Sequence, residues 1–353
     1  MKKIVLTGGG TAGHVTPNIA LLPALQAAGY EIAYVGSYEG IEKKLIADFN
    51  IPYTGISTGK FRRYLDPKNF SDPFRVMKGF VEARNYLKNY QPDVVFSKGG
   101  FVSVPVVRAA ASLHIPCIIH ESDMTPGLAN KLCIPVAEKV CCNFPETMKN
   151  IPADKAVLTG SPIRAELAQG SRLAGLNMCG FTANKPVIMV IGGSLGAANV
   201  NKAVRDALPK LLEDFQVVHL CGKDKNTPGY KQFEYIKAEL KDIFAMADVV
   251  ISRAGANAIC ELLALKKPNI LIPLPAASSR GDQLLNAASF EAQGYSIVLN
   301  EDDITTNLLV DKVHELYFNR QNYVEAMSRS HQMDAINTIM LLINEAANKS
   351  HTQ

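Results

Sequence analysis

Short, nearly continuous apolar runs alternate with segments of helical pattern along the whole chain, and this alternation constrains the fold more than any other feature. The runs are Ile4–Thr7, Glu31–Val35, Val94–Ser97, Cys117–Ile119, Val187–Ile191, Val217–Leu220, Val249–Ser252 and Ile270–Ile272. Strands that lack a polar face are buried on both sides, as in parallel sheets covered by helices. We therefore predict an α/β protein with doubly wound parallel sheets.

The same opening occurs once in each half of the chain. Residues 5–25 (VLTGGGTAGHVTPNIALLPAL) and 189–204 (MVIGGSLGAANVNKAV) each lead from a strand through a glycine turn into a helix. At 353 residues the chain is also longer than one core usually fills. We predict two Rossmann-like domains, 1–162 and 163–353, divided where Gly160, Pro162 and Gly170 interrupt the pattern. A last helix is expected at Met333–Ala347, and the sequence does not decide to which of the two domains it belongs.

Composition excludes several classes of protein. With 47% hydrophobic and 20% charged residues the chain is typical of a globular protein, and a net charge of +4 gives no reason to expect nucleic-acid binding. The 7 cysteines form no Cys-x-x-Cys pair, which favours a reducing compartment over disulfides or a zinc site. No apolar run is long enough for a signal peptide or a membrane span, so we expect a cytoplasmic protein.

The first glycine turn, TGGGTAGHVTP at residues 7–17, brings backbone amides and a helix N-terminus to one place. Thr16 is suited to cap that helix and Pro17 to occupy its first position. Such a place favours an anion, most often phosphate, and the alternative is a tight turn without a ligand. Further glycine turns at residues 97–105 and 192–196 predict a cleft between two domains that binds a phosphorylated ligand.

A nicotinamide dinucleotide site is one alternative, because Gly8, Gly10 and Gly13 satisfy G-x-G-x-x-G. That site needs an acidic residue at the end of the second strand to hold a ribose. The strand ends in 35–37 (VGS) and only Glu39 follows shortly after. The nicotinamide interpretation is weakened accordingly.

Several segments, in order, carry a resemblance that covers nearly the whole chain. They are GGGTAGHVTP, KGGFVSVP, IIHESDMTPGLANK, TGSPIR, GGSLGAANVN, ADVVISRAGANAICELLALKKPNILIPLP and GDQLLNA. They resemble the MurG family of peptidoglycan glycosyltransferases. The resemblance implies a glycosyltransferase B fold, in which two Rossmann-like doubly wound domains face a cleft. It also implies transfer of N-acetylglucosamine from UDP-N-acetylglucosamine to the C4 hydroxyl of the muramyl sugar of lipid I, giving lipid II. The alternatives are another sugar-nucleotide transferase with a lipid or natural-product acceptor, and a non-catalytic nucleotide-sugar binding protein.

Inverting glycosyl transfer needs a base for the acceptor hydroxyl and a means of stabilising the departing diphosphate. The chain has no Asp-x-Asp pair of the kind metal-dependent transferases use. We therefore predict that helix N-termini, hydroxyls and arginine stabilise the negative charge of the departing diphosphate, without a metal or other cofactor. His14 is the predicted base, because the ordinary pKa of histidine is about 6.5, and Glu121 is the reserve candidate. A phosphate-binding or a capping histidine is the alternative for His14.

The resemblance assigns the other site residues. It places Thr11, Ala12 and Gly13 beside the sugar and diphosphate, Arg164 and Ser194 at the donor phosphates, Ile236 against uracil, Ala256 at a substrate contact, Glu261 on the ribose hydroxyls, and Gln283 and Asp123 on sugar groups. A linker salt bridge is the alternative for Arg164, and a solvated helix glutamate for Glu261. The chain departs from the family at Asp123, where some members have asparagine, and at Asp282, where others have a second glutamine. An aspartate accepts sugar hydroxyls but cannot donate to acceptors.

Residues 58–89 combine positive charge with apolar side chains. Their charged residues are Lys60, Arg62, Arg63, Lys68, Arg75, Lys78, Arg84 and Lys88 against Asp66, Asp72 and Glu82. Their apolar residues include Phe70, Phe74, Met77, Phe80 and Val81. This mixture predicts a peripheral membrane surface on the inner face of the cell membrane, where a lipid-linked acceptor is reached. The alternative is that Phe74, Met77 and Val81, at helical spacing, face the core. The resemblance also implies division or elongation proteins as partners.

Overall fold

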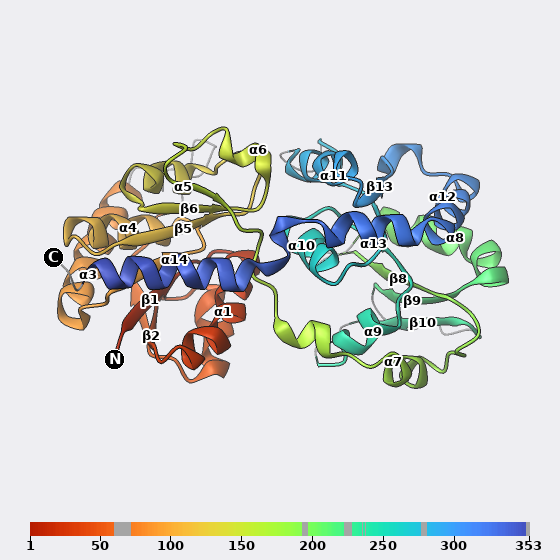
Figure 1. The fold of residues 1–353 in the computed structure, drawn as a ribbon, viewed down its shortest axis with the longest axis horizontal. Helices are drawn as coiled ribbons and strands as arrows, with labels where there is room; N and C mark the ends of the chain where they lie inside the picture. The colour runs from red at the N-terminus through yellow and green to blue at the C-terminus, as the bar shows by residue number, and fades with distance from the viewer. Residues whose placement is uncertain are drawn as a thin grey trace. The chain divides into compact units, whose positions relative to one another are not determined.

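The computed structural model (Figure 1) describes residues 1–59, 72–192, 197–221, 228–234, 236, 238–276 and 281–350. The chain divides into two compact units. The first comprises Met1–Arg164 with Asp334–Gln353, and the second comprises Ala165–Met333. The boundary expected from the sequence follows residue 162, whereas this division follows Arg164 and assigns the last helix to the first unit.

The first unit contains a parallel sheet of 7 strands in the order β3-β2-β1-β4-β5-β6-β7. The strands are β1 (Lys3–Thr7), β2 (Glu31–Ser37), β3 (Tyr53–Ile56), β4 (Val94–Ser97), β5 (Cys117–Glu121), β6 (Lys139–Cys142) and β7 (Ala156–Leu158). The helices are α1 (Thr16–Ala27), α2 (Ile41–Ile46), α3 (Asp72–Tyr90), α4 (Ser103–Ser112), α5 (Leu128–Cys133), α6 (Pro145–Met148) and α14 (Ala335–Ser350). The doubly wound order arises because crossovers on either side of β1 place helices on both faces of the sheet.

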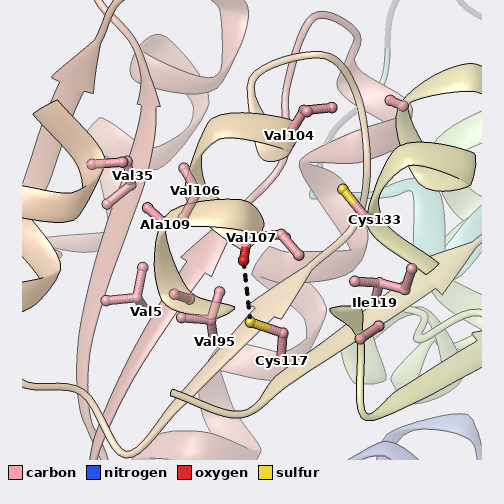
Figure 2. Close-up of a cluster of buried hydrophobic side chains, with 14 of the residues drawn as sticks. Val5, Val35, Val95, Val104, Val106, Val107, Ala109, Cys117, Ile119 and Cys133 are labelled. Carbon is pink, nitrogen blue, oxygen red and sulfur yellow. Dashed lines mark hydrogen bonds between the residues drawn. The ribbon is translucent and has the colours of Figure 1, made fainter. Parts of the chain in front are cut away.

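Side chains of each strand alternate between two buried cores, one on each face of this sheet. Val5 packs with residues of α3, α4 and α5, and Figure 2 shows part of this core. In Figure 2 the Sγ of Cys117 also approaches the carbonyl oxygen of Val107, 3.8 Å away. Ile4 and Leu6 point to the opposite face, where they pack with α1 and α14. Because α14 supplies buried apolar residues to this core, the end of the chain is an integral part of the first unit (Figure 1).

The second unit repeats the arrangement with 6 strands in the order β10-β9-β8-β11-β12-β13, all parallel. The strands are β8 (Val187–Ile191), β9 (Gln216–Leu220), β10 (Tyr230–Phe233), β11 (Val249–Ser252), β12 (Asn269–Leu271) and β13 (Ser296–Val298). The helices are α7 (Arg172–Cys179), α8 (Ala198–Asp214), α9 (Leu240–Met246), α10 (Ala256–Ala264), α11 (Asp282–Ala292), α12 (Thr306–Phe318) and α13 (Arg320–Ser328). Apolar residues of α8 and α12 pack on one face of this sheet.

The predicted fold class is confirmed: each unit is a Rossmann-like doubly wound parallel sheet. Each apolar run named from the sequence overlaps a strand, and Val94–Ser97, Val187–Ile191 and Val249–Ser252 match a strand residue for residue. The sequence pattern did not identify β3, β6, β7, β10 and β13. These strands are short and, except for β6, lie toward the sheet edges, where the pattern of burial is weaker.

Candidate active site

The chain order of the first sheet reverses between β1 and β4, which pair in parallel from Ile4↔Val94 to Thr7↔Ser97. Open α/β sheets bind their ligands at the carboxyl ends of the strands at such a reversal. The loops that follow these two strands touch, because the amide of Gly9 donates to the carbonyl oxygen of Gly99 over 3.3 Å. Two of the predicted glycine turns therefore meet at one place in the first unit.

His14 ends a short 3-10 helix, Ala12–His14, in the first of these loops and is half-buried. Its Nδ1 lies 3.0 Å from the carbonyl oxygen of Gly9 and 3.2 Å from Oγ1 of Thr11. A carbonyl oxygen can only accept a hydrogen bond, so we assign the proton of the neutral ring to Nδ1. The lone pair then lies on Nε2, where the ring can accept a proton but cannot donate to a phosphate.

The pKa of His14 is lowered to about 4, first by burial and second by the positive charge of Lys98. The hydrogen bond to Gly9 and the negative charge of Glu42 act in the opposite direction. The imidazole is therefore uncharged near neutral pH. Among the roles predicted for His14, this state favours a proton acceptor over a cationic phosphate ligand.

Several backbone amides of the first glycine loop are engaged within the protein. Four of these bonds join Gly9 to Gly99, Gly10 to Glu42, His14 to Thr11 and Val15 to Ala12. The expectation that this loop offers its amides to a phosphate is wrong for these four groups, because each already has an acceptor. The loop instead holds its own shape around His14.

The start of α1 also differs in detail from the prediction. The helix begins at Thr16 with Pro17 in its first turn, as expected, but Thr16 makes no capping bond to an amide. Its hydroxyl donates to the carbonyl oxygen of Ala12 over 2.6 Å. Thr16 already lies inside the helix, where a threonine hydroxyl reaches back to the carbonyl four residues earlier.

The sequence reasoning missed an acidic residue that follows the second strand. Glu42, in α2, is only 1% exposed, whereas Glu39 is exposed. Its carboxylate accepts from the amides of Gly10 (3.1 Å) and Ser37 (2.9 Å). Burial acts to raise the pKa of Glu42, yet the bonds from Ser37 and Gly10 hold it below its ordinary value. The carboxylate is thus committed to the protein's own amides rather than presented to a ribose, and the glycines at 36 and 40 were the available signal.

Glu121, the reserve candidate for the base, ends β5 and is buried. Its Oε1 accepts from the amide of Asp123 (2.9 Å), and its Oε2 accepts from the amide of Gly127 (3.1 Å) and from Nδ2 of Asn130 (2.8 Å). Both oxygens therefore fix the loop at 122–127, which contains the half-buried Asp123. This geometry suits an anchor better than a proton acceptor.

A buried lysine, to which the sequence analysis gave no role although it opens the KGGFVSVP segment, accompanies the histidine. Lys98 follows β4 and is 1% exposed, and its Nζ donates to Oγ of Ser122. Burial first, and the charge of Lys98 second, lower the pKa of both His14 and the fully buried His120. His120 Nε2 lies 2.8 Å from the carbonyl oxygen of Gly160. The carboxyl edge of the first sheet is therefore a region in which histidines are held uncharged.

The second sheet reverses between β8 and β11, which pair from Val249↔Ile188 to Ser252↔Ile191. The chain leaves β11 and enters α10 through Gly255, which occupies the N-cap and makes no side-chain capping bond. Asn286 of α11 holds the preceding turn, because its Nδ2 donates to the carbonyl oxygen of Ala254 over 3.1 Å. The amides around Ala256 begin a helix at the reversal, where a helix dipole favours an anion.

The remaining predicted site residues are divided between the two units. Glu261 is half-buried in α10, so it shares a helix with Ala256. Gln283 lies in the first turn of α11, and its Oε1 accepts from the amide of Leu274 over 3.1 Å. Arg164 and Ile236 are half-buried. Ser194 lies outside the described residues, as do the basic and apolar residues of the stretch 60–71.

The described part of the basic, apolar segment forms α3. Phe74, Met77 and Val81 are 79%, 63% and 52% exposed, and we call these three residues the α3 stripe. The alternative that they face the core is wrong, because the opposite face of α3 supplies the buried Ala83 and Leu87. Periodicity located one face of the helix but could not say which side of it met the sheet.

Comparisons with known proteins give the family of the chain. Residues 4–142 match the glycosyltransferase family 28 N-terminal domain, and residues 187–340 match its C-terminal domain. The UDP-N-acetylglucosamine--N-acetylmuramyl-(pentapeptide) pyrophosphoryl-undecaprenol N-acetylglucosamine transferase of Lachnospira eligens is 64% identical over 98% of this chain and 99% of its own length. The Clostridium botulinum protein of the same name is 56% identical over the same shares. The crystal structure of Acinetobacter baumannii MurG is similar at a TM-score of 0.74 with 26% identity, over 98% of this chain and 100% of that one.

Proposed function

The chain belongs to glycosyltransferase family 28, and from that premise we propose that it transfers N-acetylglucosamine from UDP-N-acetylglucosamine to lipid I, giving lipid II for peptidoglycan synthesis. Relatives that are 56% and 64% identical over 98% of the chain are named for this reaction. They do not favour a different acceptor or a non-catalytic binding protein. The fold is that of the glycosyltransferase B enzymes, as the similarity to a MurG structure supports.

The observation that carries the proposal is the contrast between the two sheet reversals. In the first unit, backbone amides of the glycine loop donate hydrogen bonds within the protein, and the loop surrounds an uncharged His14. In the second unit the chain enters α10 through Gly255 at the reversal between β8 and β11. The histidine at the first reversal suits a proton acceptor, and the helix N-terminus at the second suits an anion. A sugar-nucleotide transferase needs both.

We assign the nucleotide of the donor to residues of the second unit and to Arg164, the residue at which the chain leaves the first unit. The start of α10 with Ala256 would bind the diphosphate, with Ser194 and Arg164 as further partners of the phosphates. Glu261 would accept from the ribose hydroxyls, and Ile236 would contact the uracil. Gln283 would bind the donor sugar through its side-chain nitrogen, Nε2, since its Oε1 already accepts from the amide of Leu274.

We assign the acceptor to the first unit, with Nε2 of His14 taking the proton of the C4 hydroxyl. Thr11, Ala12 and Gly13 precede His14 and would border the transferred sugar, with Asp123 at a neighbouring loop. A group with a pKa of about 4 is ready to accept a proton at neutral pH but is a weak base. The diphosphate of the acceptor adds negative charge, which raises the pKa of a nearby histidine, so we expect a higher value in the acceptor complex.

The test is release of UDP from UDP-N-acetylglucosamine with a lipid I analogue, in EDTA. We expect His14→Ala to lower kcat by about 100-fold or more with little change in donor affinity, because a general base contributes about 10²–10⁴ in rate. Glu261→Ala should raise the donor KM instead. His114→Asn, at an exposed histidine of the same unit, is the matched control. Unchanged turnover in His14→Ala removes that residue as base, and strict metal dependence contradicts the charge assignment.

We further propose that the protein acts peripherally on the inner face of the cell membrane through the α3 stripe. Among the helices in the described ranges, none has the length and apolar character that crossing a bilayer requires. Exposed Arg75 and Lys78 lie beside the stripe, and such mixtures of apolar and cationic side chains bind anionic lipid surfaces. Partners in division or elongation remain a prediction from the resemblance.

Sedimentation with vesicles of phosphatidylglycerol and phosphatidylcholine tests this surface. Phe74→Ser should reduce the bound fraction severalfold, because each buried apolar side chain contributes about 1.5–3 kcal/mol. Phe318→Ser, at a phenylalanine that is 76% exposed in the second unit, is the control and should bind as the parent does. Equal loss in both variants would argue against α3 as the membrane contact.

A further inference from the structure

The peptide group between Gly9 and Gly10 is held from both of its sides. Its N–H donates to Oε2 of Glu42 over 3.1 Å, and its C=O accepts from Nδ1 of His14 over 3.0 Å. In a trans peptide the N–H and C=O point in opposite directions, so this one group links the carboxylate to the imidazole. Hydrogen bonds in such a chain polarise one another.

The space around the carboxylate of Glu42 is kept open by three glycines, which lie in the first glycine loop, in β2 and directly before α2. A Cβ on Gly9 or on Gly40 would overlap the carboxylate, and a Cβ on Gly36 would lie 2.8 Å from its Cγ. The other oxygen, Oε1, accepts from the amide and hydroxyl of Ser37 at the end of β2. The carboxylate is therefore built into the fold on all sides, and β2 is the fixed base from which it reaches the loop.

We propose that Glu42 is a positioning residue, which orients the imidazole of His14 through the Gly9–Gly10 peptide. In some enzymes a carboxylate bonds directly to a catalytic histidine and holds it in one tautomer. Here a peptide group lies between the carboxylate of Glu42 and the imidazole of His14 and would transmit the same effect. The bond from the carboxylate fixes the plane of the peptide, the peptide carbonyl keeps the proton on Nδ1, and Nε2 is left as the acceptor. No proton moves to Glu42.

The negative charge of Glu42 also favours His14 as a proton acceptor. It raises the pKa of His14, whereas burial and Lys98 lower it. The imidazole is therefore a stronger base than it would be without Glu42. The groups that act on His14 electrostatically are Lys98 on the loop after β4 and Glu42 on α2. Loss of Glu42 would therefore remove an orienting bond and a favourable charge together.

The first test compares Glu42→Gln with Glu39→Gln, which removes the same charge from an exposed position in the turn before α2. The inference rests on the proposed function for its kinetic readout. We expect Glu42→Gln to lower kcat by about 10–100-fold, as displacement of a catalytic group by about 1 Å does, with the donor KM unchanged. Glu39→Gln should retain the parent kcat. Parent-like kcat in both variants would overturn the assignment.

A second readout needs no substrate. The ¹⁵N shifts of histidine-labelled protein report the tautomer of His14, which should be a single Nδ1–H form in the parent and a mixture in Glu42→Gln. An unchanged single tautomer in Glu42→Gln overturns the positioning role. If the parent protein shows no transfer, the proposed function fails, but this measurement still decides the role of Glu42.

A third comparison guards against a variant that merely unfolds. Gly9→Ala crowds the carboxylate without removing it, so it should lower kcat in the parent background. In a Glu42→Ala background the added methyl enters vacated space, and it should lower kcat by no more than about twofold further. Independent, multiplicative losses from the two substitutions would contradict the proposal.

Discussion

Replacing Gly100 with alanine tests whether contact between the two loops of the first unit positions His14. Gly100 has a φ of +86°, which an L-residue adopts at a cost of about 1–2 kcal/mol. A Cβ at this position would overlap the carbonyl oxygen of Gly9 and lie 3.3 Å from Nδ1 of His14. The substitution therefore acts on the very oxygen that fixes the ring.

The expected magnitude combines backbone strain with crowding. Crowding of a packed site costs about 1–3 kcal/mol, so Gly100→Ala should lower the free energy of unfolding by about 2–5 kcal/mol. Because a shift of about 1 Å at a catalytic group costs about 100-fold, kcat should fall by about 10–100-fold. The affinity for UDP should stay unchanged, since we assign the nucleotide to residues of the second unit.

Urea unfolding and steady-state kinetics measure the two effects. Gly29→Ala separates strain from crowding, because Gly29 has a φ of +75° and an added Cβ would meet nothing within 4 Å. That control should lose about 1–2 kcal/mol of stability and keep its kcat. A Gly100→Ala protein with the parent kcat would refute the reasoning that this loop contact orients His14.

Two further predictions concern charge. Lys98→Met should move the pKa of His14 from about 4 part of the way toward 6.5, because burial is the larger cause and Lys98 the second; an NMR titration that shows no rise would contradict the coupling. His219, fully buried and with a pKa lowered to about 4, stabilises the folded state above pH 6.5, and this contribution is lost as the pH falls toward 4. Between pH 7 and pH 5 the protein should lose about 2 kcal/mol of unfolding free energy through this residue. Urea unfolding of His219→Asn should show a pH difference smaller by that amount, and an equal difference in both proteins would count against it.

The sequence predicted those parts of the fold that depend on local pattern. Continuous apolar runs such as Val187–Ile191 identified the central strands, and glycines at their ends located both reversals. Edge strands such as β3 and β7 were not predicted, because the sequence pattern of a half-buried strand of three or four residues differs little from that of a loop. Helical spacing found the α3 stripe but left its direction open until packing of Ala83 and Leu87 determined it.

The electrostatic parts of the site could not be predicted, since they depend on contacts between distant segments. Glu42 lies in a stretch reading GIEKKLI, where a glutamate is ordinarily solvated, and only the approach of residues 9–10 gives it a role. The same holds for Lys98, which opens a recognised segment but whose burial and contact with Ser122 depend on the folded chain. His14 was found because it stands in a motif, but its tautomer follows from the carbonyl of Gly9 alone.

Hydrogen–deuterium exchange of the whole chain, with and without UDP, tests the central claim most directly. The claim is that the start of α10 holds the nucleotide diphosphate, while the glycine loop of the first unit is already bonded within itself and serves the acceptor. We predict that UDP slows exchange in residues 255–260 and leaves residues 8–14 unchanged. Slower exchange confined to residues 8–14, with residues 255–260 unaffected, would contradict the account.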